Sequence, residues 1–281
     1  MPSLTLNGAE LNYVLEGAGA PAFLFVHGGC CALQDWARQL EALKGGFRAA
    51  ALDLRGHGRS AVGVGELSVE QWAADVNAAI DALALGPVVL TGHSLGARVA
   101  AEAAWRRPDQ IAALVLLDAS RTVGGRARTE PLCEDAAPPT EASLREILDL
   151  TVGPYATADV RAHVIATMSG APASVMQAAV RALADWDSRR ADVVFADMDP
   201  KAPVLAIQST YHDSLTPRRS LRHGEDSTPF LDFLRQVRPA TTIRILPETG
   251  HFSMLERPEA VTALIRDFGL SAWRLREGCS R

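Results

Sequence analysis

The chain has 281 residues and a formal net charge of −5 at pH 7, with 48% hydrophobic and 22% charged residues. This length can bury a full core, and the composition is typical of a globular protein rather than a fibrous or disordered one. The acidic balance argues against a nucleic acid or an anionic membrane as partner, because polyanion binders carry a basic face. No apolar run approaches the roughly 20 residues that span a bilayer.

The N-terminus and the cysteines bear on compartment and metal content. No basic start followed by an apolar stretch marks a signal peptide. The four cysteines, which show no C-x-x-C spacing, are Cys30, Cys31, Cys133 and Cys279. We therefore expect reduced thiols, a cytoplasmic protein and no metal site. The assembly state is expected to be a monomer or a homodimer, between which the sequence does not discriminate.

The first 120 residues alternate between predicted strands and predicted helices. Alternating residues around "NG" in 3–17 predict a hairpin, and continuous apolar runs predict strands buried on both faces. Helical spacing follows two of these runs. The predicted strands lie in 21–29, 47–54, 86–94 and 111–120, and the predicted helices in 68–85 and 95–108. This alternation predicts a right-handed, mostly parallel α/β sheet.

The alternation stops after residue 120 and resumes near residue 202. Residues 121–140 are rich in proline and charge, and 141–187 show helical spacing without strands. We expect an α/β core of residues 1–120 and 201–281, with residues 121–200 inserted as a helical cap (lid). Such a cap would cover the carboxyl edge of the sheet, where open α/β sheets bind ligands.

The stretch "GHSLG" at 92–96 places Ser94 between a predicted strand and a predicted helix. In a G-x-S-x-G turn the serine is held above the sheet by a sharp, strained backbone. Gly92 and Gly96 fit this reading, because a side chain at either position would collide with a neighbouring element. A serine before a helix also serves as an ordinary cap. The strand before it and the small-residue helix after it favour Ser94 as the nucleophile.

A serine nucleophile needs a base and an oxyanion hole. His251 follows the last predicted strand, from which it can reach the serine turn, so we expect it to be the base. Structural roles are preferred for the other histidines considered, His57, His93, His163 and His223. For the oxyanion hole we expect the N–H groups of Leu95 and Gly29, with Cys30 as the alternative to Gly29.

These residues together resemble the α/β-hydrolase family. The motifs are "HGG" at 27–29, "DLRGHGRS" at 53–60, "GHSLG" at 92–96 and "GH" at 250–251, and the resemblance covers nearly the whole chain. It implies an eight-stranded, mostly parallel sheet, a variable helical cap, a Ser–His–acid triad and no cofactor. It also implies a structural role for 53–60, and it disfavours epoxide-hydrolase and dehalogenase chemistry, because those relatives carry aspartate where this chain has Ser94.

The acid of the triad is open between two aspartates. The resemblance implies an acid after the seventh strand, where Asp213 stands four residues before Pro217. Ser209 replaces the usual glycine there, however, and the spacing is one residue longer. A minority of relatives place the acid after the sixth strand, where Asp118 stands, although an aspartate there can also be structural. Asp213 is preferred, and Asp118 is the rival.

The predicted function is a serine hydrolase acting on a small-molecule carboxylic ester or lactone. The same residues also suit C–C bond or amide hydrolysis, perhydrolysis or lyase chemistry, or a ligand receptor that retains the fold. Residues at helical spacing are more often core than pocket. Candidate pocket-wall residues are Cys30, Trp36, His93, Met168, Met176 and Trp186.

Overall fold

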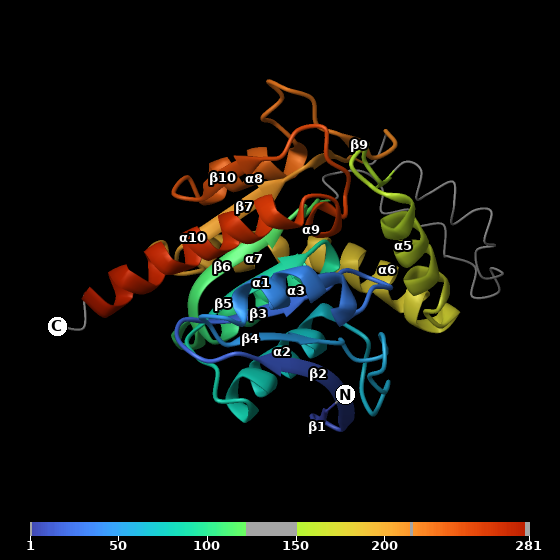
Figure 1. Ribbon diagram of the computed structural model, residues 1–281, viewed down its shortest axis with the longest axis vertical. Helices are drawn as coiled ribbons and strands as arrows, with labels where there is room; N and C mark the ends of the chain where they lie inside the picture. The colour runs from blue at the N-terminus through green and yellow to red at the C-terminus, as the bar shows by residue number, and fades with distance from the viewer. Residues whose placement is uncertain (1, 122–150, 214–215, 279–281) are drawn as a thin grey trace.

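The computed structural model describes residues 2–121, 151–213 and 216–278. Its centre is an eight-stranded sheet with the strand order β1-β2-β4-β3-β5-β6-β7-β10 (Figure 1). The strands are β1 (Ser3–Leu6), β2 (Ala9–Glu16), β3 (Ala22–Val26), β4 (Ala49–Leu52), β5 (Val88–His93), β6 (Ile111–Leu117), β7 (Val204–Gln208) and β10 (Thr242–Ile245). Only the β1–β2 and β2–β4 pairings of this sheet are antiparallel. The predicted eight-stranded, mostly parallel sheet is confirmed.

The predicted hairpin at the N-terminus connects β1 and β2. Its central residues Asn7 and Gly8 have φ angles of 48° and 77°. Positive φ at both positions is what a two-residue type I′ turn requires, and asparagine followed by glycine adopts it at low cost. The "NG" dipeptide therefore sets the register of the two edge strands.

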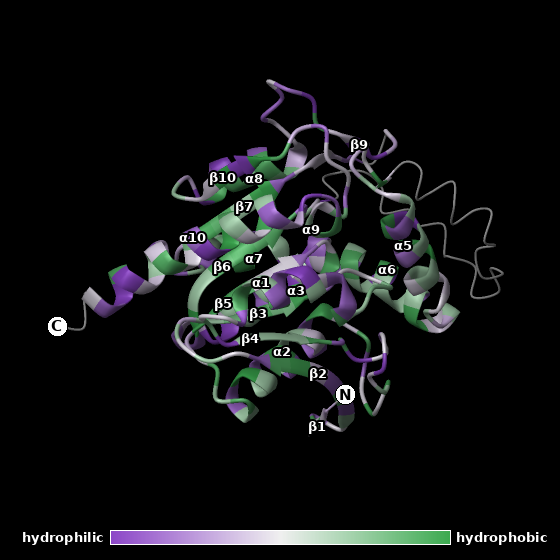
Figure 2. Cartoon of the chain, in the orientation of Figure 1, coloured by the Kyte–Doolittle hydropathy of each residue, from purple (hydrophilic) through white to green (hydrophobic). Residues whose placement is uncertain are grey.

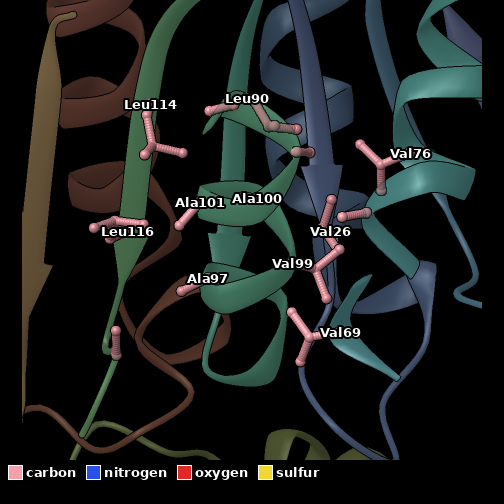
Figure 3. Close-up of a cluster of buried hydrophobic side chains, with 14 of the residues drawn as sticks. Val26, Val69, Val76, Leu90, Ala97, Val99, Ala100, Ala101, Leu114 and Leu116 are labelled. Carbon is pink, nitrogen blue, oxygen red and sulfur yellow. The ribbon is translucent and has the colours of Figure 1, made fainter. Parts of the chain in front are cut away.

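Helices cover both faces of the sheet. They are α1 (Ala37–Leu43), α2 (Val69–Ala82), α3 (Leu95–Arg106), α8 (Pro229–Val237), α9 (Ser253–Glu256) and α10 (Pro258–Gly278). Side chains alternate along β3, so that Leu24 and Val26 join the core shared with α2 and α3 (Figure 3). Phe23 and Phe25 join the core shared with α1 and α10. Figure 2 shows hydrophobic residues concentrated on the central strands β5, β6 and β7.

Between β6 and β7 the described part of the chain contains three helices, which are called the inserted helices below. They are α5 (Ala158–Ser169), α6 (Ala173–Arg189) and α7 (Ala191–Asp197). The first two match the helical spacing predicted within 141–187, whereas residues 141–150 lie outside the described residues. Helix α7 was not predicted, since it is short and owes its place to burial of Val194 and Phe195 in the core. In Figure 1, α5 and α6 lie at the opposite end of the molecule from the C-terminal end of α10.

A second, small ladder follows β7. Strands β8 (Thr210–Tyr211) and β9 (Arg219–Ser220) pair antiparallel. The sequence did not predict this pair, because two-residue strands leave no alternation to detect. It matters to the site because Arg218 immediately precedes β9.

The longest described helix, α10, has 21 residues. Charged side chains recur along it, and only one side of it is buried. Within the described ranges, no helix has an apolar stretch long enough to cross a membrane.

Candidate active site

Ser94 lies on the turn between β5 and α3. Its backbone angles, φ 54° and ψ −113°, are strained for a residue with a side chain. Its hydroxyl makes no capping hydrogen bond to α3, so the alternative reading of Ser94 as a helix cap does not describe this turn. The side chain is partly exposed. A strained position without a capping bond is typical of a serine held for reaction.

The flanking glycines make this turn possible. A Cβ on Gly92 would lie 2.0 Å from the carbonyl oxygen of Gly96, and a Cβ on Gly96 would lie 2.4 Å from that of His27. Both distances are far below van der Waals contact, and backbone atoms cannot move aside cheaply. The predicted need for glycine at both positions is confirmed.

The loop after β3 faces the start of α3. Gly28 allows a close approach, because a Cβ there would lie 2.9 Å from His93 Nδ1. Cys30 has a φ of 59°, a second strained position beside the turn. Gly29 and Leu95 both line the cavity described below. The first N–H groups of a helix lack partners within it and carry its positive dipole end, so the cavity suits a developing negative charge.

His251 is held from three sides. Its Nδ1 lies 2.5 Å from Asp118 Oδ2. Its backbone N–H donates to the carbonyl of Thr151 at 2.6 Å. Its carbonyl accepts from His93 Nε2 at 2.9 Å. Because Nδ1–H is directed to Asp118, Nε2 is left as the nitrogen that can accept a proton.

Asp118 ends β6 in a fully buried, strained conformation with φ 43°. The chain that follows β7 surrounds its carboxylate with donors: Ser209 N at 2.9 Å, Thr210 N at 2.8 Å and Thr210 Oγ1 at 2.6 Å. Burial by itself raises the pKa of Asp118. The hydrogen bond from His251 and the nearby positive charges of His251 and Arg218 outweigh it, and they hold the pKa well below its usual value. Asp118 is therefore ionised against the imidazole.

The preference for Asp213 as the carboxylate partner of His251 is corrected by this geometry. Asp213 lies in the loop between β8 and β9, where it accepts from the Tyr211 hydroxyl at 3.0 Å and from Thr216 N at 2.7 Å. The Nδ1 proton of His251 is directed to Asp118. The spacing to Pro217 favoured Asp213. The residues directly after β7 instead donate their backbone N–H groups to Asp118.

Arg218 is a charged neighbour that the sequence did not single out. Its Nη1 lies 2.8 Å from Thr210 Oγ1, 3.3 Å from Asp118 Oδ2 and 3.2 Å from His251 Nδ1. Burial lowers the pKa of His251, and Arg218 lowers it further, against the raising effect of Asp118. His251 is therefore neutral near pH 7, as a base must be.

A cavity of about 310 Å³ opens over these residues. Ser94 and His251 line it, as do four of the predicted pocket-wall residues. These four are Cys30, His93, Met168 and Met176. Burial raises the pKa of the Cys30 thiol to about 11, so its thiolate is scarce near neutral pH and the thiol serves as wall.

Two predicted pocket-wall residues are wrong. Trp36 is fully buried in the core beside Phe25, with ring centroids 4.9 Å apart. Trp186 lies inside α6, where its indole N–H donates to Glu102 Oε2 at 2.9 Å. Both tryptophans turn toward the interior, because burying a large ring in a core removes more apolar area from water than lining an open cavity does.

The sequence missed several other wall residues. They are Gly28, Cys31, Thr151, Ala179, Val180, Leu183, Arg218 and Phe252. Leu183 falls on the same face of α6 as Met176, which is a helical signal for a shared wall. Phe252 directly follows His251. Nothing in the sequence marks Thr151 or Arg218.

No group of three or more metal-ligating side chains comes together in the described part of the chain. Cys30 and Cys31 are buried free thiols, whereas Cys133 and Cys279 lie outside the described residues. The groups that reach the cavity include the Ser94 hydroxyl, the His251 imidazole and the Arg218 guanidinium.

Comparisons with known proteins bear on the family and the fold. The model of the alpha/beta hydrolase family matches residues 23–264. An epoxide hydrolase from Caballeronia sordidicola is 38% identical over 114 residues, which are 40% of this chain and 34% of that protein, so the match spans about a third of the relative's length.

Two solved structures show the same fold. The enol-lactonase from Burkholderia xenovorans LB400 has a TM-score of 0.75 at 23% identity, over 95% of this chain and 99% of that one. A thermophilic esterase from Thermogutta terrifontis has a TM-score of 0.76 at 24% identity, over 96% and 98% of the two chains.

Proposed function

The chain belongs to the alpha/beta hydrolase family, and on this premise we propose that it is a serine hydrolase that cleaves a carboxylic ester or a lactone through an acyl-enzyme on Ser94. One observation carries the proposal. Ser94, on its strained turn, and His251, bound to Asp118, open into the same cavity. A substrate carbonyl in that cavity would meet a hydroxyl, a base and the start of a helix together.

In the first half of the reaction, His251 Nε2 takes the Ser94 proton as Ser94 Oγ bonds to the substrate carbonyl carbon. The carbonyl π-electrons move to oxygen, giving a tetrahedral oxyanion. On collapse the ester C–O bond breaks, and the imidazolium returns the proton to the leaving alkoxide. Serine and imidazole must approach to hydrogen-bonding distance with substrate bound, a contact that is often loose in free enzymes.

In the second half, His251 takes a proton from water as the water oxygen bonds to the acyl carbon. Collapse breaks the bond to Ser94 Oγ, which regains the proton, and the carboxylic acid leaves. Asp118 holds the imidazole in the Nδ1–H tautomer and stabilises the imidazolium in both halves without itself taking the proton.

The oxyanion is stabilised by two backbone donors in this proposal. Leu95 N–H, at the start of α3, and Gly29 N–H, in the loop after β3, belong to residues that line the cavity. Fixed donors aimed at a developing charge contribute about 3–4 kcal/mol each to the barrier reduction in acyl-transfer enzymes. The strained backbones of Cys30 and Ser94 persist because the surrounding structure holds both loops in place.

The inserted helices belong to a cap in this proposal, with 121–200 as the cap and 1–120 and 201–281 as the core. Met168 on α5 and Met176 on α6 line the same cavity as the core residues Ser94 and His251. Methionine side chains adapt to varied apolar shapes. The cap then selects the substrate while the core supplies the chemistry.

The direct test is hydrolysis of 4-nitrophenyl butyrate by the wild type and by Ser94→Ala. We expect a loss of at least about a thousandfold in kcat/KM. Ser188→Ala, which removes an exposed hydroxyl on α6, is the matched control and keeps wild-type activity. A fluorophosphonate should label Ser94 in the wild type, as read by peptide mass spectrometry. Undiminished turnover by Ser94→Ala would refute the nucleophile.

A further inference from the structure

Arg218 is a buried cation in the wall of the reaction cavity, and the proposed acyl transfer does not use it. Only 12% of its side chain is exposed, and it lines the cavity together with Ser94 and His251. Taking a charge out of water is costly unless an opposite charge compensates it. The groups around Arg218 therefore indicate whether its charge is compensated within the protein or by a bound ligand.

Two other buried arginines show one way in which this chain compensates such a charge. Arg55 binds Asp75 through two hydrogen bonds, Nε to Oδ2 at 2.9 Å and Nη2 to Oδ1 at 3.0 Å. Arg98 binds Asp187 in the same forked way, at 2.7 and 2.8 Å, which is the bidentate geometry that suits a guanidinium best. A third buried arginine, Arg238, donates to three backbone carbonyls instead.

Arg218 has no such carboxylate among the described residues. Its one ion pair is the 3.3 Å contact of Nη1 with Asp118 Oδ2, and that same oxygen is bound by His251 and Thr210. Its hydrogen bonds to described residues, with Asp118 Oδ2 and Thr210 Oγ1 as acceptors, both come from Nη1. The Nε and Nη2 donors, which form the fork in two of the other arginines, are left for a group outside this set.

The wall around Arg218 is mainly apolar, with side chains such as Met168, Met176 and Phe252. Inside such a wall a charge-assisted hydrogen bond between the guanidinium and an anionic ligand is stronger than it would be in water.

We propose that Arg218 is a specificity-determining residue that binds a carboxylate carried by the substrate, so that this hydrolase prefers esters or lactones with a free carboxylate over neutral ones. The inference rests on the proposed function of Ser94 and narrows its substrate class. A carboxylate matches the fork of Nε and Nη2, which no described residue engages. Small-molecule sites are usually lined by apolar side chains, with a few polar groups that fix the orientation of the ligand.

The test compares two esters that differ in one charged group, mono-4-nitrophenyl glutarate and 4-nitrophenyl valerate. The measured quantity is the ratio of their kcat/KM values, which cancels any damage that a variant does to the shared acyl-transfer steps. We expect the wild type to favour the glutarate ester and Arg218→Gln to lower the ratio by roughly 10- to 100-fold, the loss typical of a hydrogen-bonded charge pair. Arg218→Lys, which keeps the charge but not the fork, should fall between them.

Arg219→Gln is the matched control. Arg219 is the next residue and carries the same charge, but it is exposed and paired with Glu225, so its loss should leave the ratio unchanged. A wild type that prefers the valerate ester, or an Arg218→Gln ratio equal to that of the wild type, would overturn the proposal. If Arg218→Gln does not fold, the kcat/KM ratios of the wild type and of Arg218→Lys still test the proposal.

A binding measurement separates this proposal from the proposed function. Glutaric acid monoanilide and its neutral analogue valeranilide are titrated calorimetrically into Ser94→Ala and into Ser94→Ala with Arg218→Gln. Only the carboxylate ligand should weaken in the double variant, by roughly 10-fold or more. This result without any ester hydrolysis by the wild type would refute the hydrolase and keep the anion site. Equal affinity in both variants would refute the anion site whatever the enzyme hydrolyses.

Discussion

Asp118 and Asp213 are two aspartates near the same edge of the sheet, and the structure surrounds them in opposite ways. Asp118 stands directly at the end of β6, fully buried, with donors from the neighbouring chain after β7 on both oxygens. Asp213 lies five positions beyond the end of that neighbouring strand, in a half-buried turn where it accepts from Thr216.

The difference teaches that position in the sheet decides the electrostatic role of a carboxylate. Parallel neighbours bring the ends of β6 and β7 together, so backbone N–H groups of one strand end reach the side chain of the other. Such fixed donors keep a buried carboxylate ionised and aimed. The oxygens of a carboxylate in a turn accept hydrogen bonds from groups of that same turn and so stabilise it.

The largest expected effect distinguishes the two aspartates by activity. Asp118→Asn should lower kcat for 4-nitrophenyl butyrate by about 10³- to 10⁴-fold, because an amide in that place favours the wrong imidazole tautomer. Asp213→Asn should stay within about twofold of the wild type, since Asp118 holds the Nδ1 proton. Steady-state kinetics on both variants, with circular dichroism to verify folding, makes the comparison. A crippled Asp213→Asn beside an active Asp118→Asn would reverse it.

A smaller effect is expected from the donors around each carboxylate. Thr210→Val removes the 2.6 Å hydrogen bond to Asp118 Oδ2 and should lower kcat by about 10- to 150-fold, the range of one hydrogen bond to a charged group. Thr216→Val, which removes a hydroxyl bonded to Asp213, is the control and should leave kcat unchanged. If the two variants lose activity equally, the hydrogen bond from Thr210 to Asp118 has no special part in positioning His251.

The pH profile sharpens the comparison further. Because burial and then Arg218 lower the pKa of His251, the acid limb of kcat/KM for a neutral ester should have its midpoint below 6.5, the ordinary value for histidine. Activity is lost as pH falls through that midpoint, since the base becomes protonated. Arg218→Gln removes a positive charge, so the midpoint should move to higher pH. Arg219→Gln should not move it, and a shift to lower pH in Arg218→Gln would contradict the assigned cause.

The smallest effect concerns stability at the turn. Asp213→Asn should lower the free energy of unfolding by about 1 kcal/mol or less, because an amide oxygen still accepts from Thr216 and the site is half exposed. Chemical denaturation with urea at pH 7 measures it. A loss of several kcal/mol would mean that the turn is held as rigidly as the end of β6.

Much of this fold follows from local pattern. Alternating apolar runs and helical spacing predict most of the strands and helices, and the predicted positions of Ser94 and Gly96 depend only on residues next to them along the chain. The glycines are needed because backbone atoms of the adjacent elements lie about 2 Å from where a Cβ would be. Such constraints involve residues that lie close together along the chain, so they can be predicted from the sequence.

The sequence by itself thus determined the order of strands and helices, the turn at Ser94 and the histidine after the last strand. Only the tertiary structure decided which carboxylate faces His251, that Trp36 and Trp186 belong to the interior, and that Arg218 enters the cavity. The contact of Asp118 with His251 joins residues 133 positions apart. The hydrogen bond from Thr210 N–H to Asp118 joins residues 92 positions apart. These partners meet because β6, β7 and β10 are successive neighbours in the sheet, and no periodicity within a window of the sequence records that.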